Sequence, residues 1–459
     1  MSDPVIVWFR RDLRLSDQAA VVAAASEGPV IPVYILDDES PGDRKMGGAS
    51  RWWLHHSLKS LDATLREKES RLILRRGKVT DVLPDLVEEV GAKRVYALQH
   101  YEPWWAEAED ALSGGLDLCL HDGNYLAPPG SVTTGSGNPY KIFTPFWRAL
   151  KERMPPSEPM RRPQKIDAPS FWPDSEKLDD WGLLPTSPNW ATQMEEEWEP
   201  GEEGARKRLA TFEDEASRYE GQRNCPSVEG TSMLSPHLHF GEISPATIYN
   251  RVKNAGGSVA TFLKELGWRD YAQNVILQFP DYPEKNARDR FNAFQWRDFR
   301  SSTVRDEFDA WTKGRTGYPI VDAGMRQLWA IGWMHNRVRM IAASFLIKHL
   351  LIDWREGEQW FWDTLVDADY GSNGTNWQWV AGTGIDSNMF VRVMAPLSQS
   401  EKFDSAAYIR EWVPELADLS DDDIPDPPED KRPDEYPAKL VEHREGRERA
   451  LEAYRAMKD

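Results

Sequence analysis

The sequence is poor in cysteine and has no long apolar run. Only two of its 459 residues are cysteine, Cys119 and Cys225, which is too few for a disulfide framework or a cysteine-based metal site. No apolar stretch approaches the ~18 residues that a membrane-spanning helix needs. The first residues, MSDPVIVWFRR, lack the basic and then apolar pattern of a signal peptide. We therefore expect a cytoplasmic protein without a membrane partner.

Positive charge is also in short supply. The chain has 56 Lys and Arg against 75 Asp and Glu, a net charge of −19. An acidic chain repels DNA in general, so any contact with nucleic acid requires a local basic face. Tryptophan, in contrast, is abundant, and many of the 21 tryptophans fall between Trp296 and Trp379. A large core accounts for some of them, but their clustering also indicates a site.

The first third of the chain has the pattern of an α/β domain. Short runs rich in Val, Ile and Leu alternate with helix-like stretches such as RWWLHHSLKSLDATLREK, which predicts a parallel sheet with both faces covered. The expected strands are residues 5–9, 30–36, 71–76, 94–98 and 116–120. The sequence RRDLRLSD follows the first of them, where a dinucleotide-binding protein would carry G-x-G-x-x-G. The fold expected is therefore Rossmann-like without that fingerprint.

Composition then divides the chain into three parts. We predict an α/β domain over residues 1–127, a linker rich in Pro, Gly and Ser over 128–203, and an all-α domain over 204–459, where apolar residues recur every three or four positions. The acidic, Pro-rich segment 415–436 is expected to be a solvated loop before a last helix, with a regulatory role left open.

Two stretches of the helical part carry candidate binding residues. The hydroxyl residues Thr231, Ser232 and Ser235 stand at an expected helix start, where they would bind a phosphate or simply cap the helix. Further on, Glu265, Trp268 and Arg269 share one face of an expected helix. They are equally consistent with a binding site and with an ordinary surface pair over a core tryptophan.

Two later stretches are richer in polar groups. Residues 332–340 are expected to place Trp333, Asn336, Arg337 and Met340 together on a helix, where a buried Asn336 amide would need a ligand or another helix as its partner. Residues 367–379 contain Asp367, Asp369 and Asn373 before Trp377 and Trp379, in a segment composed otherwise like a loop. With no histidine or third carboxylate near the two aspartates, we expect no metal there and favour hydrogen bonds to a polar cofactor.

Several long motifs follow one another in order along nearly the whole chain: VIVWFRRDLRLSD, YKIFTPFWR, VEGTSMLSP, ELGWRDY, TGYPIVDAGMRQL, GWMHNRVRM, DADYGSNGTNWQWVAGTG and QSEKFD. In these motifs the chain closely resembles the photolyase/cryptochrome family, in particular the microbial photolyases that repair cyclobutane pyrimidine dimers. The resemblance implies an N-terminal α/β domain, a long linker and a helical domain that binds FAD. It also implies a carbon–carbon lyase in which excited reduced FAD gives an electron to the dimer, the ring opens and the electron returns.

The resemblance assigns residues to the cofactor. Asn373 corresponds to the residue that faces flavin N5, where a neutral amide stabilises a reduced, anionic flavin and a carboxylate would repel it. The implied FAD-binding set is Tyr219, Thr231, Ser232, Met233, Leu234, Ser235, Phe262, Arg269, Arg339, Asp367, Asp369 and Asn373.

The resemblance also assigns a substrate site for UV-damaged DNA. A weakly paired dimer is flipped from the duplex, and photolyases are a standard example of enzymes that flip bases. Trp268 and Trp379 would replace the lost stacking, Glu265 and Asn336 would bind the thymine carbonyls and imides, and arginines would hold the adjacent phosphates. The implied set is Arg223, Glu265, Trp268, Asn336, Arg337, Met340, Trp379 and Gln399, with Glu265 and Asn373 as the catalytic pair.

Three further tryptophans correspond to the family's electron-transfer chain. Trp377 corresponds to the member next to the flavin, Trp354 to the second and Trp296 to the outermost. The assignment of Trp296 depends on an apparent insertion, RDFRSSTVRDEF, before Trp311.

A second, light-harvesting chromophore in the α/β domain is open. Folate-binding members carry an Asn-Glu pair where this chain has Trp104 and Trp105, and two indoles should crowd a pterin. Arg51 is retained, so a deazaflavin, or no antenna, is favoured over methenyltetrahydrofolate.

Two alternatives share the resemblance. A cryptochrome-like blue-light receptor usually has Asp in place of Asn373. A (6-4) photolyase needs a histidine pair where this chain has Asn336 and Met340, and the adjacent His335 is expected to point away on its helix. We expect a monomer that repairs pyrimidine dimers.

Overall fold

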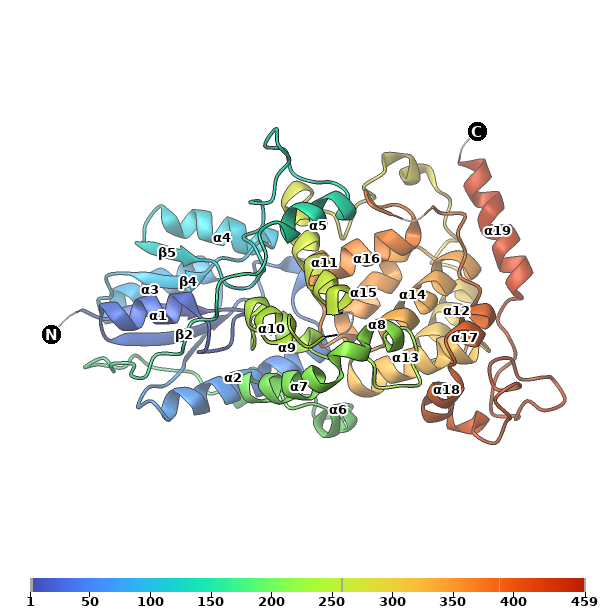
Figure 1. Cartoon of the computed structure of the whole chain (residues 1–459), viewed down its shortest axis with the longest axis horizontal. Helices are drawn as coiled ribbons and strands as arrows, with labels where there is room; N and C mark the ends of the chain where they lie inside the picture. Colours follow the sequence, from blue (N-terminus) through green and yellow to red (C-terminus); the bar gives the residue numbers. More distant parts are fainter. Residues whose placement is uncertain (1–2, 257–258, 388, 458–459) are drawn as a thin grey trace. The chain divides into compact units, whose positions relative to one another are not determined.

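The computed structural model describes residues 3–256, 259–387 and 389–457. The chain forms two compact units, and each contains two segments of chain: residues 1–217 with 232–280, and residues 218–231 with 281–459. Figure 1 shows the chain coloured along its sequence. These units are divided at residues 217, 231 and 280, whereas the predicted domains are divided at residues 127 and 203; the predicted domains stay a prediction.

A five-stranded parallel sheet forms the centre of the first unit, in the order β3-β2-β1-β4-β5. All five predicted strands are present, shifted at their ends by no more than two residues. They are β1 (Val5–Phe9), β2 (Val30–Leu36), β3 (Ile73–Arg76), β4 (Val95–Leu98) and β5 (Leu118–His121). In the central pair, Val5 lies opposite Val30 and Phe9 opposite Tyr34. The α/β prediction is confirmed.

Every residue of β1 and β2 is buried, as expected for a parallel sheet that helices cover on both faces. Helices α3 (Val79–Val90) and α4 (Pro103–Ser113) complete one core, in which Leu83 and Leu112 join Trp8 and Val33. Helix α1 (Ala19–Glu27) packs on β1 and β4 (Figure 1).

The stretch RRDLRLSD after β1 binds backbone of its own unit. The buried Arg14 guanidinium donates to the carbonyls of Gly123 at 2.9 Å and Gly241 at 2.8 Å and to Asn124 Oδ1 at 2.9 Å. Asp12, also buried, accepts hydrogen bonds from the backbone N–H of Arg10 and from Gln18. Where a dinucleotide fingerprint would stand, this chain has a polar hub that joins distant segments.

The remaining helices of the first unit follow the sheet. They are α2 (Gly48–Arg66), α5 (Phe143–Lys151), α6 (Thr192–Glu197), α7 (Glu202–Glu215), α9 (Ser235–His239), α10 (Pro245–Val252) and α11 (Val259–Gln278). Short 3₁₀ turns stand at Gly42–Arg44, Leu178–Trp181 and Ala216–Arg218. Helix α5 lies within the predicted linker, residues 128–203, which we call the connector. It packs against α11 and buries Phe143, Phe146 and Leu150.

The second unit is helical throughout its described residues. Its α-helices are α8 (Tyr219–Gln222), α12 (Ser302–Thr312), α13 (Pro319–Ile331), α14 (Asn336–Ser344), α15 (Trp354–Thr364), α16 (Tyr370–Ala381), α17 (Pro396–Lys402), α18 (Ala406–Trp412) and α19 (His443–Ala456). A π-helical turn, Phe345–His349, extends α14, and 3₁₀ turns stand at Asp289–Ala293 and Pro414–Leu416.

One expectation for this unit was wrong, and one segment differs from what its composition is typical of. Residues 332–340 do not lie on one helix, because Gly332, at φ 66°, ends α13 and α14 begins only at Asn336. Trp333 therefore lies outside the helix that carries Asn336. Residues 370–381 form helix α16 despite their loop-like composition, since Asp369 caps the helix through Ser372 N and Gly374 lets it approach Pro283 closely.

The acidic segment 415–436 is attached to the second unit by buried and surface contacts. The buried Asp322 carboxylate accepts hydrogen bonds from Thr316 N at 2.7 Å, Gly317 N at 3.1 Å and the Tyr436 hydroxyl at 2.6 Å. Arg326 makes two hydrogen bonds to the Glu415 carboxylate. The segment is therefore more than a solvated loop.

No helix among the described residues is long and apolar enough to cross a bilayer.

Candidate functional site

Helix α11 carries the first group of predicted residues. Glu265 and Trp268 are half-buried, as expected for side chains that border a site. Arg269 donates to the carbonyl oxygens of Asn124 and, at 3.1 Å, of Leu238, and its guanidinium lies 4.4 Å from the Tyr125 ring centroid. The structure thus shows Arg269 bound to backbone, and its predicted role toward the cofactor stays a prediction.

One face of the Trp268 indole is covered by a phenylalanine that the sequence did not single out. The Phe143 ring of α5 lies 3.5 Å from the Trp268 ring, centroid to centroid, at an interplanar angle of 9°. Phe262, predicted to contact the flavin, is 4% exposed and packs on Phe212 at 4.4 Å.

The predicted phosphate-binding run, residues 231–235, precedes a very short helix. Helix α9 begins at Ser235, and Leu234 N donates to Ser232 Oγ at 3.4 Å. Met233 has a positive φ of 48°, which is rare for a residue with a side chain. The hydroxyls stand at a helix start, as predicted, and the phosphate role remains a prediction.

In the second unit, Asn373 is held by a buried glutamate. Its Nδ2 donates to Glu358 Oε1 at 2.9 Å and to the Glu358 carbonyl at 3.1 Å. Glu358 is fully buried in α15. Among the described residues no donor reaches Asn373 Oδ1, so that oxygen is the polar atom left for a ligand.

The two aspartates before α16 have different partners. Asp367 forms a bidentate ion pair with Arg339, at 3.0 and 2.9 Å, and Arg339 also donates to the Met334 carbonyl at 2.7 Å. Asp369 is the N-cap of α16. Within the described part of the chain no three His, Cys, Asp or Glu side chains are grouped to hold a metal ion.

Helix α14 presents a polar face at its first turn. Asn336 is exposed, and Arg337 and Met340 are half-buried. The expectation of a buried Asn336 amide is therefore wrong, because α14 begins at this residue. His335, expected on the helix, is its N-cap: Nδ1 accepts a hydrogen bond from Arg337 N at 3.2 Å.

Arginines and aromatic rings recur around this face. Arg337 donates to Asn224 Oδ1 at 2.6 Å, and its guanidinium lies 4.8 Å from the Phe403 centroid. Arg223 lies 5.2 Å from the ring of the buried Tyr219. Gln399 on α17 and Trp379 on α16 are half-buried. An amide and aromatic rings thus help to position two guanidinium groups, and guanidinium is well suited to bind a phosphate.

The three tryptophans predicted to transfer electrons differ in exposure. Trp354 is fully buried and donates its indole N–H to Asn286 Oδ1 at 3.0 Å. Trp377 is 3% exposed and contacts Phe361 at 5.0 Å. Trp296 is half-buried beside Phe294 at 4.4 Å, as an outermost member would be. Their order as electron carriers stays a prediction.

The predicted antenna region is closely packed. Trp105 makes an edge contact with Trp8 at 5.8 Å, and the Arg10 guanidinium lies 5.4 Å from its ring. Arg51 forms an ion pair with Asp38 and donates to the Met46 carbonyl at 3.0 Å. The Arg51 charge is thus already balanced within the unit.

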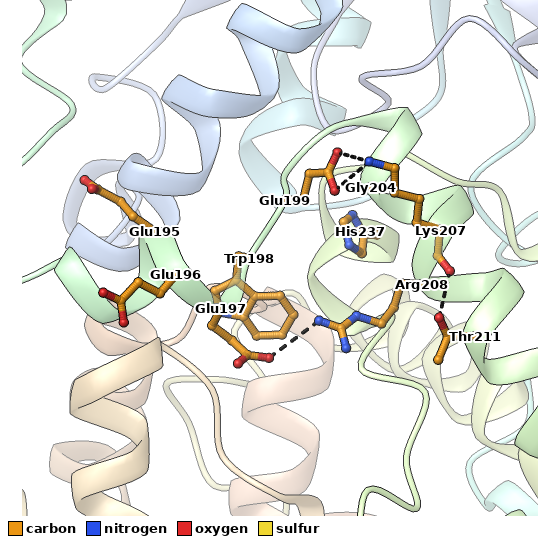
Figure 2. A pocket seen from close by; sticks show the side chains of 10 residues that line it. All are labelled: Glu195, Glu196, Glu197, Trp198, Glu199, Gly204, Lys207, Arg208, Thr211 and His237. Atoms are coloured by element: carbon orange, nitrogen blue, oxygen red, sulfur yellow. Dashed lines mark hydrogen bonds and ion pairs between the residues drawn. The ribbon is translucent and has the colours of Figure 1, made fainter.

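A cavity of about 480 Å³ lies elsewhere in the first unit, between α6, α7 and His237 (Figure 2). Glutamates dominate its lining, and Lys207 is paired with Glu199 and Arg208 with Glu197. None of the predicted site residues that the structure describes lines it. Because its cations are neutralised by its own carboxylates, this cavity is a poor match for phosphates.

Sequence reasoning missed the residues that hold the predicted ones. Phe143, Asn224, Asn286 and Glu358 each contact a predicted side chain, from positions far away in the sequence or without a distinctive pattern. Of these four, only Phe143 lies within one of the long motifs, YKIFTPFWR.

Comparison with known proteins places the chain. The family model "DNA photolyase" matches residues 5–164 and the "FAD binding domain of DNA photolyase" matches residues 262–456. A deoxyribodipyrimidine photo-lyase from Agrobacterium fabrum is 48% identical over 99% of this chain and 98% of its own length. The crystal structure of a bacterial class III photolyase from Agrobacterium tumefaciens matches with a TM-score of 0.95 at 48% identity, covering 100% of this chain and 98% of that one.

An archaeal photolyase from Sulfolobus tokodaii, solved with two FAD molecules, matches with a TM-score of 0.83 at 30% identity, over 99% of this chain and all of that one. Two family models, a full-length relative and two solved structures therefore agree with the resemblance carried by the motifs. The chain belongs to the photolyase/cryptochrome family.

Proposed function

We propose that this protein is a light-dependent deoxyribodipyrimidine photo-lyase, which splits cyclobutane pyrimidine dimers in UV-damaged DNA with FAD as its cofactor. The observation that carries the proposal is Asn373, whose amide is fixed by Glu358. A receptor of the plant cryptochrome type would be expected to carry a carboxylate there. The full-length similarity to a deoxyribodipyrimidine photo-lyase supports the same choice.

The residues present fit FAD by their chemistry. Asn373 Oδ1 offers an acceptor, and an acceptor is what the N5–H of a reduced flavin requires. The neutral amide adds no charge next to an electron-rich ring. The Arg339–Asp367 pair offers donors and acceptors for the polar parts of the cofactor, and its two charges cancel. When it is bound and reduced, FAD supplies on illumination the electron that opens the dimer.

The proposed FAD-binding residues are Tyr219, Thr231, Ser232, Met233, Leu234, Ser235, Phe262, Arg269, Arg339, Asp367, Asp369 and Asn373. Their side chains bind and orient the cofactor, and the buried Glu358 holds the Asn373 amide in one orientation.

The proposed substrate residues present flat surfaces, amides and cations to the flipped dimer. Trp268 and Trp379, both half-buried residues, supply stacking surfaces. Glu265 and Asn336 bind the polar edges of the thymines. Met340 and Gln399 belong to the same proposed substrate site, as the family resemblance implies. Arg223 and Arg337 hold phosphates, and the Asn224 amide helps to fix Arg337 without adding a negative charge.

We also propose that Trp377, Trp354 and Trp296 conduct electrons to the flavin. Trp354 and Trp377 are buried and so shielded from water. Trp296 is half-buried, which gives the electron-transfer pathway an end near solvent.

For the light-harvesting site, we propose a deazaflavin or no second chromophore, in preference to methenyltetrahydrofolate. The packing of Trp105 on Trp8 and Arg10 supports the exclusion of a pterin from that place. The Arg51–Asp38 pair makes an empty site the better of the two choices, because a guanidinium already paired gains less from an anionic ring. We further propose that the protein acts as a monomer in the cytoplasm.

The test is repair itself. Chemically reduced, FAD-loaded protein is mixed with an oligonucleotide that contains one dimer and is exposed to blue light, and intact lesions are counted with a dimer-specific endonuclease. We expect lesions to disappear in light and to persist in the dark. Unchanged lesion numbers after illumination, with FAD bound and reduced, would exclude the proposed activity and favour a receptor.

A further inference from the structure

We propose that Phe143 positions Trp268 for recognition of the pyrimidine dimer, which makes helix α5 of the connector part of lesion recognition. The inference rests on the proposed function, because it assumes that Trp268 stacks on the flipped dimer. It starts from the motif YKIFTPFWR, to which neither the composition nor the resemblance assigns a task.

The two rings form a close parallel stack. Their centroids are 3.5 Å apart and their planes differ by 9°. Phe143 is 2% exposed, whereas Trp268 is half-buried. One face of the indole is therefore covered by protein, and what remains exposed of the side chain is available for a base.

Neighbouring groups fix the Phe143 ring in turn. Trp147, one turn further along α5, lies nearly parallel to Phe143 at 6.5 Å and 11°, and Tyr271 contacts both Phe143 and Trp268 edge-on at 5.6 Å. The Lys264 ammonium lies 5.6 Å from the Phe143 centroid. A flat ring at position 143 is thus held by aromatic contacts from several directions.

Glycine at position 267 makes this approach of α5 to α11 feasible. A Cβ there would lie 2.5 Å from a ring carbon of Trp147. The residue next to Trp268 therefore has no side chain, so that the aromatic side of α5 can pack directly against α11. Trp268 is held on a support from a different segment of chain.

A fixed indole gives a rigid stacking surface at little entropic cost. If Phe143 were replaced by a flexible aliphatic side chain, Trp268 would reach other rotamers and would have to be ordered each time a dimer binds. Undamaged DNA, held by phosphate contacts, would lose much less. The signature of positioning is therefore a loss of preference for dimers over undamaged DNA.

The experiment compares F143L with F143Y and with the matched control F146L. Phe146 is on the same helix, is 1% exposed and packs on Tyr271 at 5.6 Å, so F146L removes a comparable buried ring. Binding of the FAD-loaded protein to dimer-containing and undamaged duplexes is measured in the dark. Flipping is followed by the fluorescence of 2-aminopurine opposite the lesion.

We expect F143L to reduce the ratio of the two affinities by about threefold to tenfold, the equivalent of one aromatic pair, and to weaken the 2-aminopurine signal at saturation. F143Y keeps a flat ring and should retain both. F146L should lower the thermal midpoint about as much as F143L and leave the ratio unchanged.

Equal losses of preference in F143L and F146L, or unchanged preference in F143L, would overturn the inference while leaving wild-type repair intact. Failure of the wild-type protein to prefer or repair dimers would instead overturn the proposed function and the inference with it.

Discussion

At the scale of single residues, the predicted site is clearest at Asn373. The role of Asn373 could be predicted from the sequence because this residue stands at a fixed place in a long motif. Its partner Glu358 could not, since the contact joins α15 to α16 and neither segment has a pattern that predicts which faces meet. A sequence shows which side chains are available, whereas the packing decides which of their atoms remain for a ligand.

Replacing Asn373 by Asp should weaken the reduced state of the cofactor. A carboxylate beside an electron-rich flavin is repelled by it, so N373D should lower the midpoint potential of bound FAD and slow repair, on the order of tenfold. Potentiometric titration and a repair assay measure the two effects. The control is N376D, the same change at an exposed position of the same helix, which should leave both near wild type.

Gly357 is required by the indole of Trp377. A Cβ at this position would lie 2.2 Å from a ring carbon of Trp377 and 2.5 Å from Leu346. G357A should lower the free energy of unfolding by about 1–3 kcal/mol, despite the better helix propensity of alanine. Urea denaturation measures the change. In G221A no atom lies within 4 Å of the new Cβ, so a loss as large as that of G357A would show that the close contact is not the cause.

At the scale of elements, helix α14 begins with a histidine in place of a usual cap. Burial, and then the charges of Arg337 and Arg339, lowers the pKa of His335 to about 4. A backbone hydrogen bond with Arg223 raises this pKa, and the smaller Coulombic effect of Arg223 lowers it. The cap is therefore neutral at ordinary pH, as it must be for Nδ1 to accept the Arg337 N–H.

Acid should loosen this cap. Between pH 4 and pH 6.5 the unfolded chain binds a proton that the folded His335 does not, so its contribution to stability is complete above about pH 6.5 and disappears as the pH falls to about 4. The loss amounts to about 3 kcal/mol. H335N keeps a good cap without titrating. Urea midpoints of wild type and H335N should diverge at low pH, and parallel curves would contradict the assignment.

Helix α11 shows the opposite dependence. Its buried Asp270 accepts a hydrogen bond from Ala127 N at 3.1 Å, and burial raises the pKa of this carboxyl to about 7. The folded protein then holds a proton that the unfolded chain releases near pH 4, so stability falls as the pH rises from about 4 through 7. For the wild type, the free energy of unfolding should fall by up to about 4 kcal/mol between pH 4 and pH 7. D270N, which has no carboxyl to titrate at this position, should not show this fall. Thermal midpoints at pH 5 to 8 test it, and a wild-type curve that D270N does not flatten would refute it.

Element boundaries were the least predictable part of the structure. The strands of the first unit were found from their buried apolar runs, because each run ends at a polar turn. Helix α16 was hidden by its Gly, Asn and Thr content, and tertiary contacts such as Gly374 on Pro283 override that composition. The break at Gly332 was missed because a three- and four-residue apolar pattern continues across it.

At the scale of the whole molecule, a net charge of −19 must coexist with DNA binding. The solution expected from the sequence is a few local arginines, and Arg337 is one that an amide and an aromatic ring help to hold. Affinity for dimer-containing DNA should therefore fall steeply with salt. R337A should reduce the slope of log affinity against log salt by about one.

The matched control for this measurement is R444A, which removes an exposed arginine paired with Glu448 on the last helix. Its slope should equal that of wild type. A flat profile in wild type would remove the case for a local basic face, and an equal change in both variants would show that only net charge matters.

The fold class was fully predictable, whereas the division into units was not. Alternating runs and helices determine a parallel sheet, and long periodic segments determine a helical remainder. The assignment of residues 232–280 to the first unit depends on contacts such as α5 on α11, and amphipathic periodicity shows that a helix has a buried face without showing what covers it.

The chain passes from one unit to the other three times, at residues 217, 231 and 280. A ribosome makes the chain from its N-terminus, so residues 218–231 emerge long before the rest of their unit exists. The first unit has all of its segments once Pro280 has been made, and it can close around this looped-out stretch during synthesis. The second unit must wait for its remaining helices and recover the stretch late. The order of synthesis thus imposes an order of assembly, and no single crossover between two related genes could exchange either unit intact.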